Sequence, residues 1–414
     1  MDLYYSLSIL IVLAALFSYI NLRFLKLPST IGIMLIAMTV SVGLVIVGRS
    51  YPHFHERFTS IFASVNFTEV MMGAMLNFLL FAGAIHISMH DLRKQRVPII
   101  IFSTLGVIIS TIVVGFFMYY LFVLFKIEVP FIQCLMFGSL ISPTDPIAVI
   151  GILKKAGIRK SLEIKVAGES LFNDGVAVLL FSLLLQLAQG SEVDLTFKHV
   201  AGLFIQETGG GLLMGLLLGY IGSRGIRQIN DYNVTVMITL AIVMGGYLLA
   251  RYLHVSSPLA MVAAGLVIGN YGKATAMSAA DKDYLDKFWE LIDEILNAML
   301  FLIIGFELML IPDLETYWKI GLIAIVIILL ARFISIWLPI RFTPNIGKFD
   351  RKTITILVWG GLRGGVSVAL ALTIDDHLHQ HLFISITYYV VVFSILVQGL
   401  TIGKLTQLQK FKST

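Results

Sequence analysis

The sequence predicts an all-α protein that crosses a membrane many times. Two observations support this fold class: the low content of charge and the length of the apolar runs. Of the 414 residues, 58% are hydrophobic and only 13% are charged, compared with roughly 25% charged residues in soluble domains. Runs of about 18 to 25 apolar residues recur along the whole chain, and an α-helix of that length crosses about 30 Å of hydrocarbon.

Thirteen apolar segments are predicted as membrane spans. Their approximate limits are 4–22, 28–48, 66–88, 97–125, 131–153, 166–188, 199–222, 232–253, 256–271, 290–311, 319–341, 353–374 and 383–403. The ninth is short, and a polar, amphipathic stretch, 274–290, separates it from the tenth. Because the spans follow one another along the whole chain, we predict a single transmembrane domain rather than soluble modules.

Positive charge is distributed unevenly between the loops on the two sides. With the N-terminus outside, 22 of the 30 Lys and Arg residues fall on the inner side and six on the outer side. Cytoplasmic loops are enriched in Lys and Arg, so we predict a multi-pass protein of the cell membrane with its C-terminus in the cytoplasm. The net charge of +5 thus reflects orientation in the lipid bilayer. No basic face or binding motif indicates a nucleic-acid partner.

Two spans contain residues that interrupt a helix. In the fifth, Pro143 and Pro146 flank Thr144 and Asp145, and in the twelfth four glycines surround Arg363. Paired interrupted helices in two halves of a chain point to a transport site at the membrane midplane. Because these spans are seven apart, we predict two inverted six-helix repeats, spans one to six and eight to thirteen, with crossed, broken helices in spans five and twelve.

The sixth span carries two carboxylates within its apolar stretch. A charge near the bilayer centre costs roughly 2.5–3.5 kcal/mol, so such residues usually face the protein interior and mark an ion or proton path. Helical spacing places Glu169 and Asn173 on one stripe, and Ser170 and Asp174 on the neighbouring stripe. The two carboxylates therefore point in different directions, and we expect them to have different roles.

A further buried charge, Arg332 in the eleventh span, lies at a depth similar to that of Asp174. We predict that Arg332 pairs with Glu169 and hydrogen-bonds Asn173, forming a structural ion pair at the site. Asp174 is then left free to bind Na⁺ and H⁺ in turn, because a cation held in a permanent salt bridge could not be exchanged. Desolvation disfavours the charged form of a buried carboxylate, which lets protonation compete with cation binding.

The remaining polar residues of these spans are assigned to the same site. The oxygens of Asp174 and Ser170, with a backbone carbonyl near Thr144, suit a small hard cation such as Na⁺, and Asp145 is a further candidate ligand. Asp145 and Arg363 are also predicted to neutralise the half-helix dipoles at the two breaks. The alternatives are an ordinary ion pair between the breaks and a polar cluster that only holds helices together, but the latter does not explain the interrupted spans.

These motifs together resemble the sodium/proton exchanger family of monovalent cation:proton antiporters, in particular its compact prokaryotic NhaP-type members. The matching segments, in chain order, are 142–146, 168–175, 301–308, 331–332, 361–367 and 397–401. The resemblance covers most of the chain. Gly365, where the family often has Ala, is a conservative departure.

The resemblance implies a secondary antiporter, not an enzyme, with no cofactor other than the transported Na⁺ and H⁺. It implies a homodimer with a dimerisation part at about 1–90 and 232–311, an ion-translocating core at about 97–188 and 319–403, and a linker helix at about 199–222. Alternating access would be of the elevator type. In this family, Asn rather than Asp before the ion-binding Asp accompanies electroneutral exchange, and Asn173 places the chain in that group.

Two other functions stay open at this point. A K⁺-selective antiporter would use the same ligands, because selectivity among Na⁺, Li⁺ and K⁺ depends on small differences in cavity size. A cation channel is the second alternative, although channels commonly build their filter from several subunits around an axis. Three histidines in an outer loop, His377, His379 and His381, are expected to be solvated rather than to bind a metal.

Overall fold

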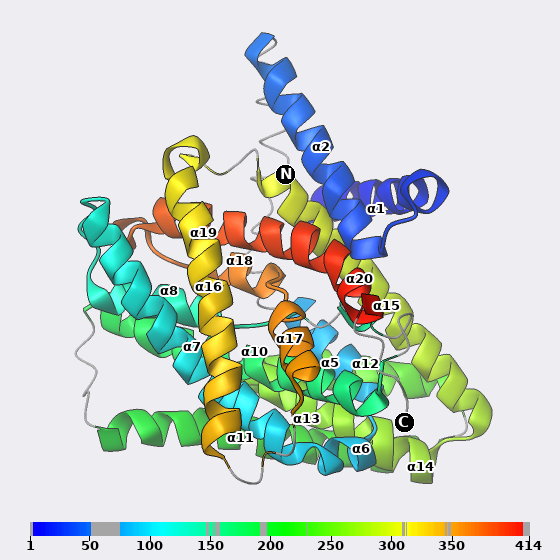
Figure 1. Ribbon diagram of the computed structural model, residues 1–414. Helices are drawn as coiled ribbons and strands as arrows, with labels where there is room; N and C mark the ends of the chain where they lie inside the picture. Colours follow the sequence, from blue (N-terminus) through cyan, green and yellow to red (C-terminus); the bar gives the residue numbers. More distant parts are fainter. Residues whose placement is uncertain are drawn as a thin grey trace.

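The computed structural model describes residues 3–50, 75–145, 149–151, 153, 158–190, 197–229, 231–308, 311, 313–343, 346 and 349–408. Within these residues every regular element is a helix (Figure 1). The protein is therefore an all-helical bundle, as the apolar runs predict.

The helices of the first half of the chain include several that are long enough to cross a membrane. They are α1 (Leu3–Ile20) with the π-helical turn η1 (Asn21–Leu25), α2 (Ser29–Ser50), α5 (Leu76–Ile85), α6 (Met89–Lys94), α7 (Arg96–Leu124), α8 (Phe131–Leu140), α10 (Lys160–Ala188) and α11 (Phe197–Ile226). Helix α10 begins six residues before the predicted sixth span, because the polar segment that precedes the apolar run is also helical.

The second half of the chain continues the same pattern. Its elements are α12 (Tyr232–Tyr252), α13 (Ser257–Val267) with η3 (Ile268–Gly272), α14 (Lys273–Ala276), α15 (Ala279–Glu307), α16 (Leu314–Phe342), α17 (Arg351–Trp359), α18 (Gly365–Leu372), η4 (Asp376–Leu378), and α19 (Gln380–Phe393), which continues through η5 (Ser394–Gln398) into α20 (Gly399–Leu408).

Seven of the described helical segments are long and apolar enough to cross a membrane. They are Leu7–Leu25, Ser29–Val47, Arg96–Leu124, Lys160–Ala188, Tyr232–Tyr252, Leu314–Phe342 and Gln380–Thr406. The chain is thus a multi-pass membrane protein. The count of thirteen spans stays a prediction, because parts of the third and fifth predicted spans, 66–74 and 146–148, lie outside the described residues.

The amphipathic stretch 274–290 continues into the predicted tenth span, since most of it forms the first turns of the 29-residue helix α15. A capping box starts that helix: Ser278 Oγ accepts from the Asp281 backbone N–H at 3.2 Å, and the Asp281 carboxylate accepts from the Ser278 backbone N–H at 3.2 Å. No glycine or proline follows before Gly305, so nothing ends the helix where its composition turns apolar.

Packing between helices distant in sequence positions the polar residues. Helix α7 lies against α8, α10 and α16, and α16 in turn lies against α19. Stacked rings of Phe137 and Phe383, 5.4 Å apart, join α8 to α19. Helix α15 crosses the molecule obliquely against α2 and α5, and the short helices α17 and α18 lie near the centre of the view in Figure 1. Helix α18 meets α8 and α10 in the interior, where the buried charges lie, and α17 packs against α16 and α20.

Candidate functional site

The site begins where two helices stop inside the bundle. Helix α8 ends at Leu140, and the chain through Asp145 is not helical; helix α17 ends at Trp359, and α18 begins at Gly365. The two non-helical segments touch, since the Asp145 backbone N–H donates to the Leu362 carbonyl oxygen at 2.7 Å. Segments more than 200 residues apart are thereby joined at the positions where the prolines and glycines interrupt the helical pattern.

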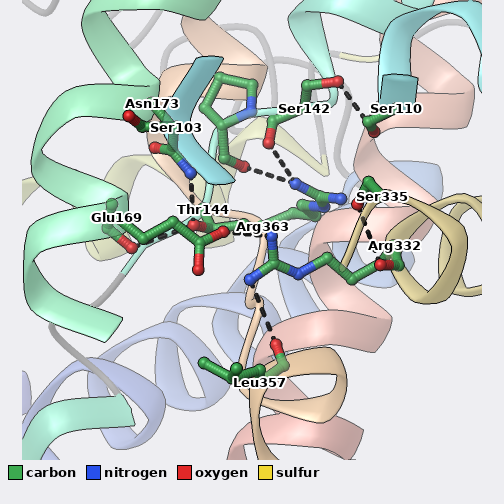
Figure 2. Close-up of polar contacts among 12 residues, drawn as sticks. Ser103, Ser110, Ser142, Thr144, Glu169, Asn173, Arg332, Ser335, Leu357 and Arg363 are labelled. Atoms are coloured by element: carbon green, nitrogen blue, oxygen red, sulfur yellow. Dashed lines mark hydrogen bonds and ion pairs between the residues drawn. The ribbon is translucent and has the colours of Figure 1, made fainter. Parts of the chain in front are cut away.

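A buried guanidinium lies at the end of α8. Arg363, which is 2% exposed, donates from its Nη1 to the carbonyl oxygens of Ser142 and Pro143, the latter at 3.0 Å (Figure 2). Carbonyl groups at a helix C-terminus carry partial negative charge and are stabilised by a cation. The Arg363 backbone N–H also donates to Ser394 Oγ at 2.8 Å. Arg363 thus connects the two interrupted segments with the α19 side of the bundle.

The opposite arrangement is found at the start of α18. A Cβ atom added at Gly364, the residue that precedes the helix, would lie 2.7 Å from both Cβ and Oδ2 of Asp145. The Asp145 side chain therefore lies directly against the N-terminal end of α18, where a carboxylate is favoured. Only glycine leaves room for this approach.

Helix α10 contributes four polar side chains, Glu169, Ser170, Asn173 and Asp174, all of them buried. Two of them meet the first interrupted segment at one hydroxyl. Thr144 Oγ1 accepts from Asn173 Nδ2 at 2.7 Å and is hydrogen-bonded to Ser170 Oγ at 3.0 Å (Figure 2). Thr144, Ser170 and Asn173 therefore form one hydrogen-bonded group that holds α10 against the break after α8.

The ion pair expected between Arg332 and Glu169 is present in the structure, with both side chains buried. A second nitrogen of the guanidinium, Nη2, donates to the Leu357 carbonyl oxygen at 3.2 Å near the end of α17. Burying one of these charges alone would be costly, and pairing offsets that cost. The pair joins α16, α10 and α17 at the level of the breaks.

The hydrogen bond predicted between Arg332 and Asn173 is not formed among the described contacts. Asn173 instead donates to Thr144, and its Oδ1 has no hydrogen-bond partner within the described part of the chain. The division into two stripes, with Glu169 and Asn173 on one and Ser170 and Asp174 on the other, therefore does not describe the contacts. The reason is tertiary: Thr144 reaches the residues of both stripes from a segment that is not helical.

Asp174 has a different environment from Glu169. It is 7% exposed, and its Oδ1 has no hydrogen-bond partner among the described residues. The charges of Asp145 and Arg363 both act on it, one repelling and one attracting the carboxylate. A buried carboxylate that lacks a fixed partner can accept a proton or a cation, and the hydroxyls of Ser170 and Thr144 are neighbouring hard oxygen donors.

Three other polar groups belong to this region and were not predicted. Ser142 Oγ donates to Ser110 Oγ at 3.0 Å, Ser394 Oγ to Gln398 Oε1 at 2.7 Å, and the charge of Asp145 acts on Asp293 of α15. Serines within apolar helices are too common to be singled out from the sequence. Asp293 could have been singled out, because it lies four residues before Asn297 at the start of the predicted tenth span, a spacing that places both side chains on one face of a helix. In the loop before α19, His379 Nδ1 is hydrogen-bonded to Gln133 Oε1 at 2.8 Å.

Known proteins resemble this chain in sequence and in fold over nearly its whole length. The sequence profile described as "Sodium/hydrogen exchanger, transmembrane" matches residues 11–408, nearly the whole chain. The chain belongs to the sodium/hydrogen exchanger family. It is 48% identical over 404 residues to the Na⁺/H⁺ antiporter NhaP of Pseudomonas aeruginosa, an alignment that covers 96% of this chain and 95% of that protein.

Further relatives of this exchanger support the same assignment. The Na⁺/H⁺ antiporter NhaH of Halobacillus dabanensis is 34% identical, with 96% of each chain covered. Among solved structures, the sodium proton antiporter MjNhaP1 of Methanocaldococcus jannaschii superposes with a TM-score of 0.76 over 98% of this chain and 99% of that one. At 20% identity this likeness shows that the fold is shared. The family assignment supports cation/proton exchange by a membrane protein rather than catalysis.

Proposed function

We propose that this protein is a secondary antiporter that exchanges Na⁺ for H⁺ across the cell membrane, with Asp174 as the shared site. The single observation that carries the proposal is the buried Asp174 carboxylate, which has one oxygen without a partner among the described residues. The neighbouring Glu169, by contrast, forms an ion pair with Arg332. The NhaP and NhaH relatives, which are named as Na⁺/H⁺ antiporters, support the choice of ions.

Exchange follows from competition at one carboxylate. With Na⁺ bound, the Asp174 carboxylate is neutralised, and Ser170 and Thr144 provide uncharged oxygen ligands. With a proton bound, the same carboxylate is neutral without a cation. Desolvation makes the empty, charged form the least stable of the three, so the site moves across the membrane loaded with one ion or the other.

The stoichiometry follows from the charge of the neighbours. Glu169 is held by Arg332, and Asn173 is neutral, so one of the two buried carboxylates on α10 remains to carry charge. We propose electroneutral exchange of one Na⁺ for one H⁺. Asp145 would act on Asp174 through its charge and through its place at the start of α18 rather than as a second carrier.

Movement of the site is proposed to be of the elevator type. The core at about 97–188 and 319–403 would move against a dimerisation part at about 1–90 and 232–311 in a homodimer, with the linker helix at about 199–222 between them. The N-terminus would lie outside and the C-terminus in the cytoplasm. The crossed interrupted helices belong wholly to the proposed core, and their mutual contacts, such as Asp145 with Leu362, would keep the site intact during movement.

The proposal is tested in proteoliposomes that carry an imposed pH gradient. Asp174→Asn should reduce Na⁺-driven proton movement to the background of empty liposomes, because the amide cannot exchange a proton for a cation. Glu315→Gln removes an exposed acid at the start of α16 and should leave exchange unchanged. Retained exchange in Asp174→Asn would contradict the proposal. Uncoupled Na⁺ flux without proton movement in the wild type would instead support a channel, and comparison of Na⁺, Li⁺ and K⁺ would identify a K⁺-selective exchanger.

A further inference from the structure

Helix α15 carries a polar pair that the exchange mechanism does not use. Asp293 and Asn297 are four residues apart, so their side chains leave the helix on the same face. Asn297 Nδ2 donates to the Asp293 backbone carbonyl oxygen at 2.7 Å, and the Asn297 side chain also interacts with the Asp293 carboxylate. The two side chains therefore form one unit with oxygen atoms close together.

Helix α15 packs against α18, the helix whose N-terminal end lies beside the Asp145 side chain. The charge of Asp145 acts on Asp293, and it also acts on Asp174. Asp145 thus repels both the carboxylate of Asp293 on α15 and that of Asp174 on α10. Arg363 is the cation that acts on Asp174. Because like charges close together raise the free energy of each ionised group, a cation between them stabilises the ionised carboxylates.

Asn297 provides the second observation. It is 2% exposed, and its Oδ1 has no hydrogen-bond partner among the described residues. A buried polar atom left unpaired destabilises the folded state, and the amide nitrogen already donates to the Asp293 carbonyl oxygen. The free atom is an uncharged oxygen beside a carboxylate, which is the ligand set that hard cations prefer.

We propose that Asp293 and Asn297 form a second subsite for a monovalent cation, on the cytoplasmic side of Asp174. A partly hydrated Na⁺ would be held there by the Asp293 carboxylate and the Asn297 amide oxygen before it reaches the exchange site. The inference rests on the proposed function and on the predicted orientation, in which α15 begins on the cytoplasmic side. It assigns to the proposed dimerisation part a direct role in cation access.

The test compares Na⁺-dependent exchange in everted and right-side-out vesicles, which present opposite faces to the added Na⁺. Asp293→Asn should raise the Na⁺ concentration for half-maximal exchange at the cytoplasmic face by about fivefold, the size expected from loss of one charge about 4 Å from a hydrated cation at the dielectric constant of water, near 80. Asn297→Leu should raise it by about threefold through loss of one oxygen ligand. Neither variant should alter the value measured at the outer face.

Glu294→Gln is the matched control. Glu294 is exposed, adjoins Asp293 and has the same charge, but its side chain leaves α15 in another direction. It should keep the wild-type concentration dependence at both faces. An unchanged value in Asp293→Asn, an equal change at both faces, a change confined to the outer face, or the same change in Glu294→Gln would each overturn the proposal.

A binding measurement separates this inference from the proposed function. Na⁺ should still raise the unfolding temperature of purified Asp174→Asn in detergent, because the second subsite remains, and the added substitution Asp293→Asn should remove that Na⁺-dependent shift. Absence of any Na⁺-dependent shift in Asp174→Asn would overturn the second subsite. By contrast, exchange that persists in Asp174→Asn contradicts the proposed function, whatever Asp293 does.

Discussion

Two buried carboxylates on α10, Glu169 and Asp174, lie little more than one helical turn apart and have opposite surroundings. Glu169 pairs with Arg332, which is itself held by the Leu357 carbonyl oxygen. Asp174 keeps an oxygen without a partner among the described residues and lies between the opposing charges of Asp145 and Arg363. Burial alone therefore does not distinguish these two carboxylates. The difference between them is that Glu169 forms an ion pair with a buried arginine, whereas no such pair is found for Asp174 among the described residues.

The largest effect on stability is expected where the paired charge loses its partner. Arg332→Ala leaves Glu169 buried and uncompensated and should lower the free energy of unfolding by about 3–5 kcal/mol. Asp174→Asn removes a buried charge that has no fixed partner and should leave stability unchanged or raise it slightly. Thermal unfolding in detergent, followed for both variants at neutral pH, measures the difference. Equal destabilisation by the two substitutions would contradict the distinction between a paired Glu169 and an unpaired Asp174.

Removal of both paired charges shows whether the loss of stability comes from the uncompensated charge of Glu169. The double variant Glu169→Leu with Arg332→Leu should recover much of the stability lost in Arg332→Ala, because a buried ion pair can often be replaced by apolar residues at little cost. A double variant as unstable as Arg332→Ala would mean that the guanidinium matters mainly through its bond to the Leu357 carbonyl oxygen.

A smaller effect is expected at the crossing that surrounds Asp174. Gly364→Ala would place a methyl group 2.7 Å from Asp145 Cβ, and such overpacking should cost about 1–3 kcal/mol and reduce the exchange rate. Gly245→Ala in α12 is the control, since a Cβ there meets nothing within 4 Å. Unfolding and exchange are measured on both variants. Normal behaviour of Gly364→Ala would show that the close approach of Asp145 to α18 is not required.

The smallest effect is expected at an exposed ion pair, which serves as a contrast to Glu169 and Arg332. Lys160 Nζ lies 3.2 Å from Asp91 Oδ2 at the start of α10. The hydrogen bond and the charge of Lys160 hold the pKa of Asp91 below its usual value of 3.8. Lys160→Ala should lower the unfolding temperature at pH 7 by less than about 2 °C.

The pH dependence of this contribution has a definite sign. Because the pKa of Asp91 is lowered in the folded state, the pair contributes fully above about pH 4 and its contribution is lost as the pH falls through that lowered pKa. The unfolding temperatures of wild type and Lys160→Ala should therefore converge in acid. A large loss of stability at pH 7 would contradict the distinction between exposed and buried pairs.

Much of the fold could be predicted because membrane insertion imposes simple rules. An apolar run of sufficient length becomes a helix, since hydrocarbon leaves no other partner for the backbone groups. A buried charge needs an opposite one, and this rule led from Glu169 to Arg332. Prolines and glycines identified the positions at which α8 and α17 end inside the bundle. The motifs that the chain shares with its family contain these same prolines, glycines and buried charges.

Other features depended on packing between distant segments. The hydrogen bond from Asn173 to Thr144 replaced the expected contact with Arg332, because the non-helical chain after α8 brings Thr144 against α10. The sequence pattern did not show that the polar stretch before the tenth span and the apolar run form one helix, α15, which begins at the capping box of Ser278.

The all-helical membrane class, the family and the burial of the charges in the sixth, eleventh and twelfth predicted spans could therefore be predicted from the sequence, since length, apolarity and charge are properties of single segments. Only the tertiary structure decided which groups meet. It placed Arg363 on the carbonyl oxygens of Ser142 and Pro143, and it brought Asp293 within reach of the charge of Asp145. Contacts of this kind depend on how helices far apart in the chain pack, which no local pattern records.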